Sequence, residues 1–141
     1  MKRKETKYII VHCTANRPGC KMTVADFRRE HQSRGFSDIG YHFLIFEDGR
    51  IAPGRPIEDV GAHCAAAGRN KDSIGIAYVG GLNVAGVTAD TRTPAQIESL
   101  RVLIEFCLKM YPDALIRGHR EFDRGKVCPC FEINNDNWRV V

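Results

Sequence analysis

The segment from Thr93 to Pro112 constrains the fold more than any other part of the sequence. Its first residues have the pattern of a capping box between Thr93 and Gln96, with Pro94 at the first helical position. Apolar side chains then recur with the 3.6-residue period of an α-helix until Pro112: Ile97, Leu100, Leu103, Ile104, Cys107 and Leu108. A helix with one continuous apolar face needs a partner surface, and we expect it to pack on a sheet.

Short runs rich in β-branched and aromatic residues predict the strands of this sheet. They lie at residues 8–12, 41–46, 51–53, 73–79 and 115–118. The Asp48-Gly49 pair predicts a hairpin turn between the second and third runs, and a capping sequence at Thr23 predicts a helix that ends near Arg34. A short turn or helix is expected around Trp138. This order predicts an α/β fold with a central mixed, mostly parallel sheet that helices cover.

Length and composition favour a single domain over residues 1–141. A chain of 141 residues, of which 43% are apolar, buries enough surface to fold without covalent cross-links. The net charge of +4 suits an anionic partner but is too small to indicate nucleic acid, which we do not expect as a partner. The apolar runs are too short for a membrane helix or a secretory signal. We therefore expect synthesis in the cytoplasm and no membrane insertion.

Two histidines and a cysteine have the placement of metal ligands. His12 and His119 each stand at the C-terminal end of a predicted strand, so their imidazoles meet at one sheet edge if the strands are neighbours. Cys128 follows His119 in the C-terminal segment. Two imidazoles and one thiolate, with the fourth position left to water, form a ligand pattern of catalytic zinc sites.

Spacing alone leaves alternatives open at these positions. The Cys128-Pro129-Cys130 sequence offers either thiol as a ligand. A histidine at a strand end is more often a hydrogen-bonded structural residue, and a buried reduced cysteine usually behaves as a small hydrophobic side chain. The pattern by itself indicates a metal site without establishing one.

Several short motifs that follow one another along the chain carry a resemblance to a known family. They are IVHCTA (residues 10–15), GYHF (40–43), GAH (61–63), SIGI (73–76), TPAQ (93–96), and GHRE (118–121) with KVCP (126–129). Together they resemble the zinc-dependent N-acetylmuramoyl-L-alanine amidases of the phage-lysozyme and peptidoglycan-recognition-protein type. The resemblance covers residues 8–133 and implies the fold of that family. It also implies a bound Zn²⁺ and hydrolysis of the amide bond between N-acetylmuramic acid and L-alanine in peptidoglycan.

The resemblance implies a role for individual residues as well. The zinc ligands of the family fall on His12, His119 and Cys128, and its catalytic residues fall on Tyr41 and Lys126. Lys126 would supply charge to the tetrahedral intermediate or a proton to the leaving amine, and Tyr41 would orient water or donate a hydrogen bond. The residues alone favour other interpretations: Lys126 as a solvated surface charge, and Tyr41 as a strand aromatic that packs on the core.

The loop that contains His63 and Asn70 matches the substrate cleft of the family, and we expect both residues to bind the sugar or the peptide. Two other histidines are interpreted as structural. Strand alternation turns His42 to the face opposite Tyr41, and His31 lies on the apolar face of its predicted helix.

The remaining cysteines are not expected to bind metal. Six cysteines without a secretory signal favour reduced thiols over a disulfide framework. Pro129 stiffens the backbone between Cys128 and Cys130, which disfavours their binding one ion together. The non-ligand set is Cys13, Cys20, Cys64 and Cys107.

Three classes of function follow from these observations. The resemblance favours a phage or prophage endolysin, a monomer that binds peptidoglycan or muropeptides and acts on the cell wall after release. The alternative is a non-catalytic peptidoglycan-recognition module; many such modules lack the thiolate ligand, whereas this chain has Cys128. RNA polymerase binding, known for some phage relatives, is not expected because only residues 1–7 precede the first strand.

Overall fold

A computed structural model describes residues 1–141. The strands are β1 (Tyr8–Cys13), β2 (Phe43–Ile45), β3 (Ile51–Pro53), β4 (Ser73–Tyr78) and β5 (Leu115–Gly118). They form one five-stranded sheet in the order β3-β2-β4-β1-β5. Only the β2–β3 hairpin is antiparallel, and the other three pairs are parallel. The prediction of a mixed, mostly parallel sheet is therefore confirmed.

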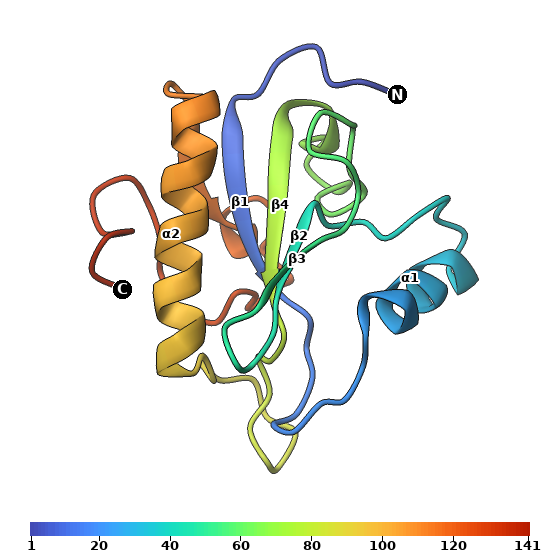
Figure 1. The fold of residues 1–141 in the computed structure, drawn as a ribbon, viewed down its shortest axis with the longest axis vertical. Helices are drawn as coiled ribbons and strands as arrows, with labels where there is room; N and C mark the ends of the chain where they lie inside the picture. The colour runs from blue at the N-terminus through green and yellow to red at the C-terminus, as the bar shows by residue number, and fades with distance from the viewer.

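Helices flank this sheet on two sides (Figure 1). They are α1 (Val24–Ser33), α2 (Pro94–Met110) and the 3-10 helices η1 (Asn70–Asp72) and η2 (His119–Glu121). Capping boxes start both α-helices, at Thr23 and at Thr93, as the sequence predicts. The short helix η1 lies in a segment where no element is expected from the sequence. No helix has the length and apolar character needed to cross a membrane.

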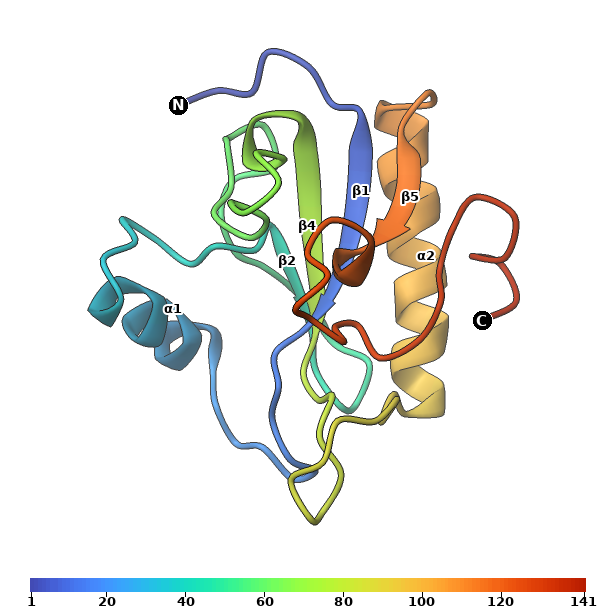
Figure 2. The ribbon, with the colours of Figure 1, turned by 180° about the vertical axis from the view of Figure 1, so that it is seen from behind.

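The larger part of the core lies between α2 and one face of the sheet. Leu100, Leu103 and Ile104 of α2 pack there with alternate residues of β1, including Ile9 and Val11. Because successive side chains of a strand point to opposite faces, His12 lies on the other face. Seen from that other side, η2 and the C-terminal segment cross in front of the strands, and α1 stands apart from them (Figure 2).

The predicted strand at residues 41–46 is shorter in the structure, where β2 begins at Phe43. Tyr41 and His42 keep sheet-like backbone bonds: the His42 N–H donates to the Gly75 carbonyl, and the Tyr41 carbonyl accepts from the Arg55 N–H. The His42 ring is fully buried; its Nδ1 accepts from the Gly75 N–H at 3.0 Å. Its Nε2 must then carry a proton and donates to the Asp59 carbonyl at 2.8 Å. His42 therefore has the structural role expected of it.

Gln96 has a second task beyond its place in the capping box of α2. The side chain is fully buried, and its amide nitrogen donates to the carbonyls of Ile45 and Val79 at 3.1 and 3.0 Å. Its amide oxygen accepts from the Thr93 N–H at 3.0 Å. One side chain thus satisfies the backbone at the ends of two neighbouring strands and at the start of α2.

We expect Gln96→Ala to lower the free energy of unfolding by about 3 kcal/mol, because it leaves buried carbonyls without a donor and removes half of a cap. Urea unfolding followed by circular dichroism measures the loss. Glu98→Ala is the matched control in the first turns of the same helix, and its exposed side chain predicts a change within about 0.5 kcal/mol. Equal stability of the two variants would contradict the bridging role.

Candidate functional site

The candidate site begins where β1 and β5 end side by side. These strands are parallel neighbours, and the last pair in their register joins Val11 to Gly118. His12 and His119 follow that pair directly, and their ring centroids are 4.4 Å apart. The prediction that the two imidazoles meet at one sheet edge is therefore confirmed.

Cys128 joins the two histidines from the segment that follows η2. One ligand atom from each of His12, His119 and Cys128 lies within 4.8 Å of the other two. The Cys128 sulfur also accepts a hydrogen bond from the Cys13 N–H at 3.0 Å, which holds it at the end of β1 beside His12. Two imidazole nitrogens and a thiolate are donors that zinc prefers, so these residues fit a zinc ion.

The thiol of Cys130 lies apart from this cluster. Its sulfur is 4.0 Å from that of Cys13 and donates to the Gly81 carbonyl at 3.6 Å. Burial raises the pKa of Cys130 to about 11, so at neutral pH it is a thiol. Of the two thiols that the sequence left open, the structure places Cys128 with the histidines. All six cysteines of the chain are free.

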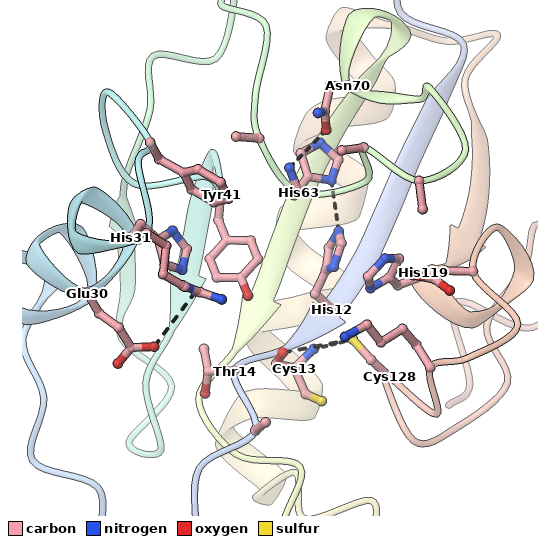
Figure 3. A pocket seen from close by; sticks show the side chains of 18 residues that line it. His12, Cys13, Thr14, Glu30, His31, Tyr41, His63, Asn70, His119 and Cys128 are labelled. Atoms are coloured by element: carbon pink, nitrogen blue, oxygen red, sulfur yellow. Dashed lines mark hydrogen bonds and ion pairs between the residues drawn. The ribbon is translucent and has the colours of Figure 1, made fainter.

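The cluster opens into a cleft of about 740 Å³ (Figure 3). The cleft is lined on one side by α1 residues and on the other by the segment that carries Lys126 and Cys128. His12 and Tyr41 lie between these two walls. A cleft of this size suits a small peptide or sugar segment.

Tyr41 and Lys126 both line the cleft beside the cluster. The Tyr41 ring centroid is 5.4 Å from that of His12, and its hydroxyl points into the cleft (Figure 3). Burial raises the pKa of the Tyr41 phenol, so the group stays protonated and able to donate at neutral pH. Lys126 is exposed, and its ammonium group takes part in no ion pair of the structure.

His12, the expected zinc ligand at the end of β1, and its neighbour His63 are buried and neutral. His12 is 2% exposed and His63 is 8% exposed. Burial, together with the charge of nearby imidazoles, lowers the pKa of each well below the ordinary value. A neutral imidazole keeps a lone pair, which is the form that binds a metal.

His63 and Asn70, the expected substrate contacts, both line the cleft. The His63 ring uses both nitrogens inside the protein: Nδ1 is 2.8 Å from His12 Nε2, and Nε2 is 3.2 Å from the Ser73 hydroxyl. The Asn70 side-chain oxygen accepts from the N–H groups of His63 and Cys64 at 2.9 and 2.7 Å. These contacts occupy both ring nitrogens of His63 and the side-chain oxygen of Asn70.

The sequence does not predict that residues of α1 form one wall of the cleft. Glu30 and Arg34 line it and form an ion pair at 3.8 Å, one turn of helix apart. Their spacing is visible in the sequence as an i, i+4 pair, but nothing local indicates that this side of the helix faces a cleft. His31 also lines the cleft, while its Nδ1 accepts from the Gly40 N–H at 2.8 Å, as its structural interpretation requires.

The fold is that of amidases and peptidoglycan-recognition proteins. The endolysin N-acetylmuramoyl-L-alanine amidase LysCS from Clostridium intestinale superimposes with a TM-score of 0.78 at 32% identity, covering 91% of this chain and 77% of that chain. Drosophila PGRP-LB superimposes with a TM-score of 0.75 at 29% identity, covering 92% and 78%. These similarities define the class of protein.

The family described as N-acetylmuramoyl-L-alanine amidase matches residues 2–131, and the chain belongs to this family. The endolysin of Escherichia phage T7 is 40% identical over 131 residues, which cover 93% of this chain and 85% of the relative. A peptidoglycan-recognition protein of Drosophila melanogaster is 31% identical over 147 residues, covering 94% and 76%. The family and fold expected from the sequence motifs are therefore confirmed.

Proposed function

We propose that this chain is a phage or prophage endolysin that uses zinc to hydrolyse the amide bond between N-acetylmuramic acid and L-alanine. The observation that carries the proposal is the convergence of His12, His119 and Cys128 at one cleft, with ligand atoms within 4.8 Å. The higher identity to a phage endolysin than to a recognition protein favours the hydrolase over a non-catalytic muropeptide-binding module. Such an endolysin is made in the cytoplasm and acts on the cell wall after release.

The side chains of the cleft supply the groups that amide hydrolysis needs. When held by His12, His119 and Cys128, zinc provides a Lewis acid that activates water and polarises the carbonyl. The Lys126 ammonium group stabilises the negative charge that develops on the carbonyl oxygen or donates a proton to the leaving amine of L-alanine. The protonated Tyr41 phenol donates a hydrogen bond to the same developing charge.

Asn70, the first residue of η1, remains the proposed substrate contact. Its side-chain oxygen is engaged by two backbone N–H groups, while its amide nitrogen has no partner within the protein. That nitrogen can donate to a carbonyl or hydroxyl group of the bound peptide or sugar. His63 has no free ring nitrogen for such a contact.

The proposed function is tested with purified peptidoglycan and the zinc-loaded chain. We expect about one zinc per chain by elemental analysis and release of new L-alanine amino termini, as three protein ligands and an open position imply. Zinc without new termini would indicate a recognition module instead. Absence of zinc from a protein folded in its presence would contradict the proposed ligand set.

Tyr41→Phe removes one hydroxyl and leaves the ring that packs in the cleft. We expect kcat on peptidoglycan to fall about a hundredfold, the usual cost of losing one donor to a developing oxyanion, with zinc content unchanged. Tyr8→Phe is the matched control, because Tyr8 opens β1 and packs edge-on against Phe122, outside the cleft lining. An unchanged kcat in Tyr41→Phe would reduce Tyr41 to a packing residue.

A further inference from the structure

We propose that His63 is a positioning residue that holds His12 in the tautomer with Nε2 protonated, so that its Nδ1 lone pair is presented to the metal. The inference rests on the zinc site of the proposed function. It gives His63 a different task from the substrate contact expected from the sequence. The tautomer of His12 follows from a buried series of hydrogen bonds that links it through His63 to Ser73, because each of these bonds can have only one donor.

The chain of hydrogen bonds has a fixed direction because it ends on a backbone carbonyl. The Ser73 hydroxyl is 2.5 Å from the carbonyl oxygen of Arg69, which can only accept. The single hydroxyl proton of Ser73 is therefore committed to Arg69. The hydroxyl oxygen, 3.2 Å from His63 Nε2, must in turn accept, so His63 carries a proton on Nε2.

The same logic passes from His63 to His12. A neutral imidazole with a proton on Nε2 has an acceptor at Nδ1. His63 Nδ1 lies 2.8 Å from His12 Nε2, so His12 donates from Nε2. Its other ring nitrogen, Nδ1, is left without a proton and is free to bind a metal. Figure 3 shows this contact between His63 and His12, with His119 and Cys128 on the other side of the His12 ring.

The His63 ring is held in place from both sides by glycines. A Cβ atom at Gly75 would lie 2.6 Å from His63 Cγ, and one at Gly61 would lie 2.7 Å from His63 Cδ2. Neither glycine has a positive φ, so the space that the ring needs, and not backbone conformation, explains them. Asn70 fixes the backbone of His63 through its side-chain oxygen. The ring has no room to turn and offer another orientation.

A histidine in this position acts on the metal through its ligand. Partners that fix the tautomer and orientation of a ligating histidine typically change metal affinity by about ten- to a hundredfold. Without His63, the proton of His12 would distribute between its two ring nitrogens. Part of the population would then present an N–H to the metal in place of a lone pair.

The test compares two variants of His63 in the full chain. His63→Leu removes the acceptor for His12, whereas His63→Asn keeps an oxygen near the position of Nδ1. We expect the Kd for zinc, measured by competition with a chromophoric chelator, to rise about ten- to a hundredfold in His63→Leu and less than about threefold in His63→Asn. An equal rise in both variants would show a merely structural role, and an unchanged Kd in His63→Leu would also overturn the inference.

A second measurement does not depend on zinc. Long-range ¹H–¹⁵N spectra of the metal-free protein report which ring nitrogen of His12 carries the proton. We expect Nε2 in the wild type and a mixture of both forms in Ser73→Ala, which removes the acceptor that orients His63 and keeps every imidazole. A proton on Nδ1 in the wild type, or an unchanged tautomer in Ser73→Ala, would refute the inference. Absence of zinc binding alongside the expected tautomer would instead contradict the proposed function.

Discussion

Cys128→Ala is expected to lose bound zinc and all measurable cleavage of peptidoglycan together. Only His12 and His119 remain as donors in this variant, and two ligands do not hold a catalytic zinc. Elemental analysis should show zinc falling from about one per chain to near zero, and the release of L-alanine amino termini should cease. Circular dichroism checks that the loss does not come from unfolding, because Cys128 is only partly buried.

The matched control for this prediction is Cys130→Ala, a change of the same kind two residues away. The Cys130 sulfur contacts Cys13 and the Gly81 carbonyl and lies outside the His12, His119 and Cys128 cluster. We expect Cys130→Ala to keep both zinc and activity. Stoichiometric zinc in Cys128→Ala, or its loss in Cys130→Ala alone, would show that the ligand set is wrong.

Lys126→Ala is expected to keep zinc and to lower kcat by about two to three powers of ten. Its ammonium group is exposed in the cleft wall, two residues before Cys128, and is not committed to any carboxylate of the protein. A charge that acts on the transition state affects kcat more than KM. Steady-state kinetics on soluble muropeptides separate the two parameters.

Two further lysine variants sharpen this prediction. Lys126→Arg keeps the positive charge but replaces the ammonium group with a guanidinium group, which stays protonated, so it distinguishes charge stabilisation from proton donation. Lys109→Ala is the surface control, since Lys109 lies near the end of α2 and outside the cleft. If kcat is unchanged in Lys126→Ala, Lys126 is a solvated surface residue, as its sequence context alone also allows.

Local signals in the sequence predict the elements of this fold well. Both α-helices start at the capping boxes at Thr23 and Thr93, and the Asp48-Gly49 turn joins β2 to β3. These signals are local because a cap or a turn involves residues a few positions apart. The sequence pattern starts β2 two residues early, at Tyr41, because strand ends depend on which neighbouring backbone is within reach.

Part of the candidate site is also visible in the sequence. The sequence places His12 and His119 at the ends of strands, and the two imidazoles meet only if those strands are neighbours. The pairing of β1 with β5 satisfies this condition. The choice of Cys128 over Cys130 comes from the family resemblance, since spacing leaves both open. In the structure the two thiols point to different surroundings.

The sequence by itself determined the two α-helices, the approximate positions of the five strands, the family and the residue types of the site. The tertiary structure alone decided what three polar side chains do: Gln96 bridges two strand ends, Arg34 faces the cleft, and His63 contacts His12. The physical reason is that each role depends on groups brought together from distant segments. For His63, the ring nitrogen that carries the proton depends on the Ser73 hydroxyl in β4, the Arg69 carbonyl and the His12 imidazole in β1. No local sequence pattern encodes that arrangement.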